Sequence, residues 1–143
     1  MKYHLFCLVL ACFSFLNSNT AQIEKTIHQT FELGDANTVQ LDLFGEYTLS
    51  PWAGNNILVE TNIQLFNSSE AILKHFIEKD QRYKVDVDTI SETTLKLFSH
   101  DKKRPAMRTN SGITTSENVV VRIFVPDNFT IVDNSTLVLE KKE

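Results

Sequence analysis

The stretch that decides the fold is ILVETNIQLF, residues Ile57–Phe66. Apolar side chains recur at every second position, and polar side chains such as Glu60 and Gln64 stand between them. Strict alternation is the period of a β-strand with one buried and one solvent-facing side. The stretch therefore predicts a half-buried strand whose inward-facing side chains are Ile57, Val59, Thr61, Ile63 and Leu65.

Alternation also marks other parts of the chain as strands. It predicts further strands at Thr38–Phe44, Arg82–Thr89 and Leu95–Leu97, and more weakly at Ile23–Leu33 and Thr136–Leu139. In Arg82–Thr89 the pattern places Tyr83, Val85 and Val87 inward, and Arg82, Lys84, Asp86 and Asp88 outward. Val119–Val125 is apolar at nearly every position, which predicts a central strand covered on both sides. Residues that favour turns separate these strands, at Gly34–Asn37, Ser50–Asn56 and Pro126–Asn128.

One segment has the helical period instead. Ile72, Leu73, Phe76 and Ile77 recur at the spacing of one helix face, which predicts a helix over Ser69–Lys79. Asn67 and Glu70 stand at the spacing of a capping pair. The apolar stripe needs a surface to cover, so we expect Ile72 and Phe76 to pack against a sheet. The predicted fold is mainly β, with antiparallel or stacked sheets in a sandwich or short solenoid and one short helix packed on a sheet.

The first 21 residues have the pattern of a secretory signal peptide. Lys2 precedes a twelve-residue apolar run, Leu5–Leu16, which is shorter than the ~20 residues a membrane-spanning helix needs. Cleavage after Ala21 would leave residues 22–143 as a single mainly-β domain. We expect an exported protein in the periplasm, at the outer-membrane surface or outside the cell. The alternative is a lipid anchor on Cys12, because Val9–Cys12 loosely resembles a lipobox.

Composition narrows the classes of function. The chain has 14 basic and 18 acidic residues and a net charge of −4, which argues against nucleic-acid binding. Both cysteines, Cys7 and Cys12, lie in the signal, so residues 22–143 cannot form a disulfide. No catalytic motif or phosphate-binding loop occurs. We expect no cofactor.

No cluster of side chains has the spacing of a metal site. His28, His75 and His100 stand far apart, whereas zinc needs three or four convergent ligands. Asp86, Asp88 and Glu92 form the tightest acidic group, but no calcium-binding loop surrounds them. We therefore expect an ordinary solvated strand face there, and we predict that the domain needs no metal.

Two features are candidate binding sites. The segment Ser99–Ser116 has no clear period and is predicted to be a long loop; its positive charge comes from Lys102, Lys103, Arg104 and Arg108. Positive charge on an acidic domain can steer an anionic partner, although such runs often serve only solubility. Trp52 is the only tryptophan and stands in a predicted turn. A turn aromatic can bind sugars or partner proteins, or fold back over its own hairpin.

A resemblance to a known family rests on Val119–Phe129, which reads VVVRIFVPDNF. The segment resembles the V-x-V-x-I-x-V-P-x-x-F strand of bacterial envelope proteins called putative adhesins of the head-GIN type, and Asn56–Thr61 is similar to another strand of that group. The resemblance implies a β-solenoid or stacked-sheet fold and an envelope location, with no established reaction. Those proteins carry Gly-rich strand repeats, whereas this chain has four glycines.

These observations lead to one expected function and one alternative. We expect an exported, non-enzymatic envelope module with adhesin-like binding or scaffolding, whose partner is an envelope protein or an anionic surface polymer. The alternative is a small hydrolase or ligand-carrying protein that uses a cavity between sheet and helix. A pocket with convergent Asp, Glu and His side chains would favour the alternative.

Overall fold

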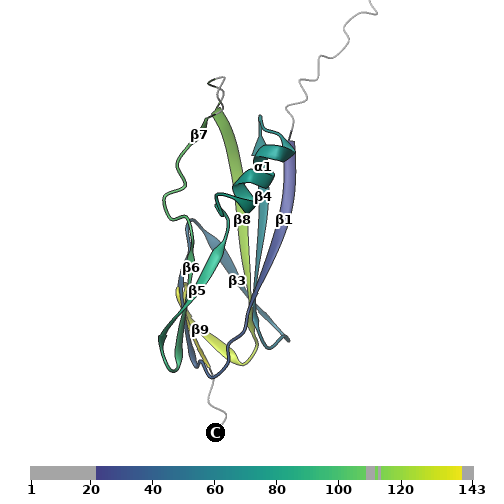
Figure 1. The fold of residues 1–143 in the computed structure, drawn as a ribbon. Coiled ribbons are helices and arrows are strands. Elements are labelled where there is room, and N and C mark those ends of the chain that lie inside the picture. Colours follow the sequence, from purple (N-terminus) through teal and green to yellow (C-terminus); the bar gives the residue numbers. More distant parts are fainter. Residues whose placement is uncertain (1–21, 109–111, 113, 140–143) are drawn as a thin grey trace, which may run out of the picture.

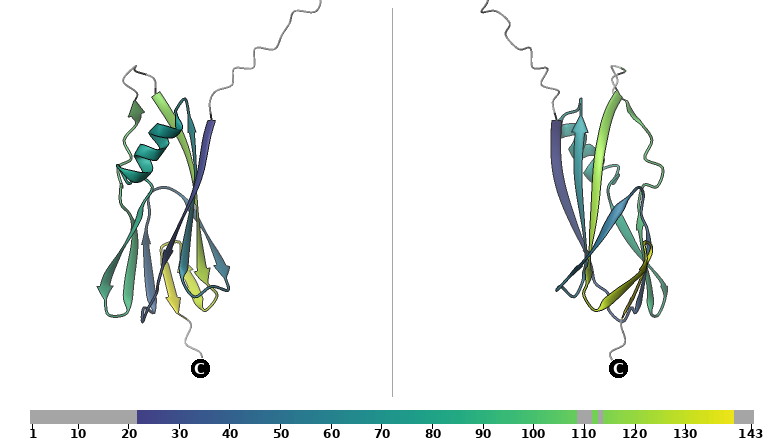
Figure 2. Two further views of the ribbon diagram at one scale, coloured as in Figure 1. Left: turned by 45° about the vertical axis from the view of Figure 1, so that its right-hand side comes forward. Right: turned by 180° about the vertical axis from the view of Figure 1, so that it is seen from behind.

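The computed structural model describes residues 22–108, 112 and 114–139 (Figure 1). In this part of the chain the protein is mainly β, with two five-stranded sheets and one short helix, as the sequence predicts. The sheets face each other at one end of the molecule and are not closed into a barrel (Figure 2). The predicted signal peptide and the lipobox-like Cys12 lie outside the described residues.

Sheet A contains the longest strands. Its order is β1 (Gln22–Phe31), β4 (Ile57–Phe66), β8 (Thr114–Pro126) and β3 (Tyr47–Trp52), and β7 (Met107–Arg108) pairs with the start of β8. β4 pairs antiparallel with both β1 and β8, whereas β3 runs parallel to β8.

Sheet B is shorter. Its order is β5 (Val85–Ser91), β6 (Thr94–Ser99), β2 (Thr38–Asp42), β10 (Thr136–Leu139) and β9 (Phe129–Asp133), with β2 parallel to β6. The consecutive strands β2 and β3 lie in different sheets, so the chain crosses the molecule between them.

Sheet A extends beyond sheet B, and this divides the molecule into two halves (Figures 1 and 2). In the sandwich half the two sheets enclose an apolar core that includes Val39, Ile57, Leu97, Ile123 and Leu137. In the helix half, the inner side of sheet A is covered by the only helix of the described residues, α1 (Glu70–Glu78), and by the segment between β6 and β7. The second core there contains Ile63, Leu65, Leu73, Tyr83 and Met107.

Two of the strands that run through both halves, β4 and β8, test the sequence predictions. β4 follows it along its whole length, because every second side chain from Ile57 to Leu65 is buried. β8 lies inside sheet A, as expected of a central strand. The prediction that it is covered on both sides is wrong: Val120 is 48% exposed and Arg122 is exposed. Only the side toward the core is covered.

The helix occurs where its period predicts it, but its cap differs. Ser69 is the N-cap residue, and its side chain accepts a hydrogen bond from the Ile72 N–H at 3.4 Å. Asn67 instead adopts a left-handed conformation with φ 55°, so the predicted capping pair with Glu70 is wrong. Leu73 is the buried residue of α1, while Ile72 and Phe76 are half-buried.

The expected strand Arg82–Thr89 begins late. β5 starts at Val85, and Arg82 precedes it in a turn with only 5% of its surface exposed, so its predicted outward orientation is wrong. Tyr83 and Val85 are buried as predicted, but Val87 is 48% exposed because β5 is an edge strand of sheet B. The two-residue period predicts the direction of a side chain only within a strand, and Arg82 lies before β5 begins.

Two predicted connections contain strand structure. Ser50–Trp52, expected in a turn, belongs to β3, where Pro51 is tolerated because β3 is an edge strand. The expected loop Ser99–Ser116 contains β7 and the start of β8. β9 was not expected from the sequence.

Candidate functional site

A groove in the helix half lies between α1 and β1. Its volume is about 450 Å³, and its apolar lining comes from Ile23 on β1 and from Leu73 and Ile77 on α1. Charged residues of both elements complete it: Glu24, Lys25, Glu70, Lys74 and Glu78. Residues Leu73 and Ile77 stand one helical turn apart and therefore face the same way. The groove thus combines an apolar lining with a mixed charged rim.

A second hollow of about 220 Å³ continues along β1. It is lined by Ile27, Gln29, Ile77, Gln81, Tyr83 and Lys84. Ile77 borders both hollows, so its side chain stands between them. Gln29 also ties the sheets together: its side-chain amide donates to the Val85 carbonyl and accepts from the Val85 N–H, both at 2.9 Å. The floor of the second hollow is therefore held in place by β5.

The strand beside both hollows is an edge strand. Each residue of β1 pairs with β4, and no other strand of the described residues pairs with it. The side of β1 away from β4 therefore presents backbone N–H and C=O groups that no strand satisfies. The groove thus lies next to an available sheet edge.

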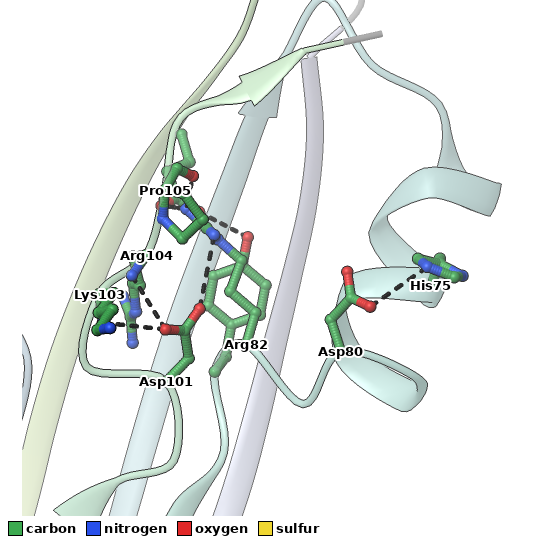
Figure 3. A network of polar contacts seen from close by, with 9 residues as sticks. His75, Asp80, Arg82, Asp101, Lys103, Arg104 and Pro105 are labelled. Carbon is green, nitrogen blue, oxygen red and sulfur yellow. Dashed lines mark hydrogen bonds and ion pairs between the residues drawn. The ribbon is translucent and has the colours of Figure 1, made fainter. Parts of the chain in front are cut away.

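A largely buried ion pair between Arg82 and Glu117 supports this half of the molecule. Figure 3 shows the surroundings of Arg82, including Asp101 and Pro105. Arg82 donates to both carboxylate oxygens of Glu117 on β8, at 2.8 and 3.2 Å, and to the carbonyl of Pro105 at 3.2 Å. The Tyr83 hydroxyl donates to Glu117 at 2.7 Å. Asp101 lies 3.8 Å from Arg82 and accepts the N–H groups of Lys103 and Arg104. These contacts join β8, the turn before β5 and the segment that follows β6.

The surroundings of the pair change its acid–base properties. Burial alone would raise the pKa of Glu117, but the hydrogen bonds from Arg82 and Tyr83 outweigh burial and lower it. Burial and the hydrogen bond to the Glu117 carboxylate raise the pKa of the Tyr83 hydroxyl far above its usual value. Glu117 is therefore held as a carboxylate and Tyr83 as a neutral hydroxyl at neutral pH. This suits a structural ion pair.

The four basic residues that the sequence analysis named lie in different surroundings. Lys102 is exposed and paired with Asp42, which also contacts Lys96 at 2.9 Å. Arg104 turns inward, and its guanidinium lies 4.7 Å from the ring of Phe44 and 5.4 Å from that of Tyr83. Lys103 and Arg108 are exposed. Two of the four, Lys102 and Arg104, are thus taken up by contacts within the chain.

Trp52 lies at the end of β3, in the sandwich half. Its indole N–H donates to the Asn56 carbonyl at 2.9 Å, and its ring covers Gly54, where an added Cβ would lie 2.4 Å from the ring. The ring centroid lies 6.2 Å from that of Phe124. Trp52 thus folds back over its own turn, far along sheet A from the groove.

The candidate metal ligands remain apart. Each histidine has its own carboxylate neighbour: Glu60 for His28, Asp80 for His75 and Asp86 for His100. Asp86 also contacts Lys84 at 2.8 Å, while Asp88 and Glu92 are exposed. Among the described residues no group of three or more His, Cys, Asp or Glu side chains has the geometry to hold a metal ion.

The groove was not assigned from the sequence. Its signal was present, since Ile23 and Ile27 alternate on β1 while Leu73 and Ile77 share a face of α1. The sequence predicts only that the helical stripe packs on a sheet and that Ile23–Leu33 is a weak strand, because a one-dimensional pattern does not say how far a helix stands from an edge strand. The expected alternative, a cavity between sheet and helix, placed a hollow in this region without naming residues.

A scan against protein-family models and searches of curated proteins and of solved structures found no match to this chain. The similarity to head-GIN adhesins therefore stays an expectation from the sequence. In the described part of the chain, no helix has the length and apolar character needed to cross a membrane.

Proposed function

We propose that this protein is a non-enzymatic binding module, and that its partner binds at the groove between α1 and β1. The observation that carries the proposal is the apolar groove, about 450 Å³ in volume, beside a strand edge that no described strand covers. Concave apolar sites with a few polar groups are the usual form of binding sites. The ion pair between Arg82 and Glu117 helps to hold the surrounding elements in position.

The cellular setting of the proposal comes from the sequence. The apolar run Leu5–Leu16 and the similarity of Val119–Phe129 to head-GIN adhesins support export and an envelope location. In that setting the module acts in adhesin-like binding or scaffolding, and its partner is an envelope protein. The pairing of Lys102 with Asp42 and the inward position of Arg104 favour a protein partner over an anionic surface polymer.

A second candidate function uses the same groove. Its volume falls within the range of about 300–1,000 Å³ that is usual for small-molecule sites, so it is large enough for a small apolar ligand. In that case the protein would carry the ligand without chemical change.

Site-specific photo-crosslinking in the native host tests the proposal. A benzophenone amino acid replaces Lys74, an exposed residue of the groove rim, and in the control it replaces Thr48, an exposed residue of β3. We expect the Lys74 variant to form a discrete adduct with an envelope protein and the Thr48 variant to form none. Equal adducts at both positions, or none at Lys74, would contradict the proposal. Native mass spectrometry that shows a bound small molecule instead would establish the carrier function.

A further inference from the structure

We infer that the partner is an extended peptide segment that pairs with the free edge of β1 as an added strand of sheet A. This inference rests on the proposed function, because it states how the groove between α1 and β1 is used. In this mode, main-chain hydrogen bonds provide affinity and pockets for alternate side chains provide specificity.

The free edge of β1 determines the chemistry of the partner. β1 has ten residues and pairs along its full length with β4 alone among the described strands. Its outer edge therefore offers a regular row of N–H and C=O groups, which only another extended main chain can match in spacing and polarity. Proteins often protect such an edge with a covering helix or loop. Here α1 stands beside the edge and leaves a groove between them.

The register of β1 places the partner's side chains. Ile23, Lys25, Ile27 and Gln29 are paired with the inward-facing residues of β4, so they point to the side of sheet A that α1 covers. Every second side chain of an added strand points to the same side, at intervals of about 7 Å. These side chains enter the hollows between β1 and α1.

The spacing of the hollows predicts a sequence pattern. β1 contributes Ile23, Glu24 and Lys25 to the first hollow, and Ile27 and Gln29 to the second, so the hollows stand about four strand residues apart. An added strand therefore fills them with apolar side chains at positions i and i+4. The side chain at i+2 faces Ile77, which borders both hollows, and is expected to be small.

Charge at the rim is balanced. The carboxylates of Glu70 and Glu78 border the first hollow with the amines of Lys25 and Lys74, and Lys74 lies 3.9 Å from Glu78. Glu24 points to the other face of β1, where its carboxylate accepts a hydrogen bond from Asn62 at 2.7 Å. The apolar positions of the peptide, rather than a charged one, therefore set the preference.

The backbone around α1 indicates that its position is specified. In the described residues, three non-glycine residues have positive φ: Asn67 at 55°, Gln81 at 50° and Arg104 at 33°. Two of them flank α1, and Gln81 also lines the second hollow. Strained backbone persists only where the surrounding structure enforces it, and it gathers at binding sites. The backbone at both ends of α1 therefore helps to fix the distance between α1 and β1, which sets the width of the groove.

Peptide selection followed by backbone methylation tests the inference. The probe is the set of peptides selected from a random display library on the purified full chain. We expect the selected peptides to share apolar residues at i and i+4. We also expect N-methylation of successive backbone amides of a selected peptide to weaken binding about tenfold or more at every second position, because only alternate N–H groups face β1.

Two variants of the protein locate the binding. Ile77 forms the ridge between the hollows, so Ile77→Arg places a longer, charged side chain there. The variant should weaken binding about tenfold or more. Ile90→Arg is the matched control, because Ile90 is also apolar but lies exposed on β5, away from the groove; it should leave affinity unchanged. Melting temperatures of both variants are measured first. If Ile77→Arg fails to fold, the methylation series on the unaltered protein still decides the question.

The outcomes separate the two proposals. Binding that depends on Ile77 but shows no two-residue period in the methylation series would overturn strand addition and leave the groove as a binding site. Selected peptides that bind Ile77→Arg as tightly as the unaltered protein would overturn both. Protection of β1 amides from hydrogen exchange, restricted to alternate residues, is the direct signature that strand addition requires.

Discussion

The sandwich half and the helix half are built on the same three strands, β1, β4 and β8, but are closed in different ways. In the sandwich half, sheet B covers the inner side of sheet A, and the core between them is apolar. In the helix half, sheet A continues without a second sheet, and α1 and the segment after β6 cover it. The interior there includes Arg82 and Glu117 beside the apolar cluster. The same alternating strands can therefore support a sandwich half that is held by apolar packing and a helix half that also depends on an ion pair.

This difference explains why the groove occurs where it does. A facing sheet of several strands covers a broad area of sheet A, whereas a single nine-residue helix covers only a narrow stripe of it. The part of β1 beside α1 is left with Ile23 and Ile27 only half-buried. The half that packs less completely is the half with a surface suited to binding.

The largest expected effect comes from breaking the buried ion pair. Glu117→Leu leaves the buried Arg82 guanidinium without its main partner and should cost about 3–5 kcal/mol of unfolding free energy, measured with urea. The double variant Arg82→Met/Glu117→Leu should recover most of this loss, because two apolar side chains need no partner. Lys102→Gln breaks an exposed pair and should cost about 1 kcal/mol or less. A double variant no better than Glu117→Leu would show that the helix half does not depend on charge.

The sandwich half should respond to shape instead. Ile123 is fully buried on β8, and Ile123→Ala should cost about 2–5 kcal/mol, through lost burial and a cavity. Val120→Ala, on the opposite face of the same strand, should change stability by about 0.5 kcal/mol or less. Similar losses for the two variants would mean that the outer side of sheet A is covered by something.

A smaller effect is expected at the contact between the sheets. Gln29→Ala removes both hydrogen bonds to Val85 and should cost about 1–2 kcal/mol in the same urea assay. Thr30→Ala is the control, because Thr30 is the next residue and is exposed on the other face. If both variants lose the same stability, strand propensity rather than the bridge to β5 accounts for the change.

The smallest effect is a dependence on pH. The pKa of Glu117 is lowered in the folded protein, so its contribution to stability is complete well above its ordinary value of 4.5 and is lost as the pH falls through the folded pKa. Between pH 7 and 4.5 the loss from this group should be less than about 1 kcal/mol. The stability difference between the unaltered protein and Glu117→Leu should shrink below pH 4.5. A difference that stays constant down to pH 3 would contradict the assigned role of Glu117.

Local patterns predicted what depends on local structure. The alternation in Ile57–Phe66 and the helical period in Ser69–Lys79 were correct, because each element buries one side whatever covers it. Arg82 was misplaced because its partner Glu117 is 35 residues away, and nothing near Arg82 in the sequence indicates that contact. The groove depends on the distance between α1 and β1, which tertiary packing sets. The sequence therefore predicted most of the elements, although not β3, β7 or β9, and it did not predict the site.

The position of Trp52 has a spectroscopic consequence. It is the only tryptophan in the chain, and it lies half-buried in the sandwich half against Gly54, Asn56 and Phe124. Intrinsic fluorescence excited at the indole band therefore monitors that half alone, while circular dichroism also registers α1. If the helix half opens first on heating, the dichroism will change before the emission does. Occupation of the groove will leave the emission unchanged, so a ligand search needs an extrinsic dye near α1.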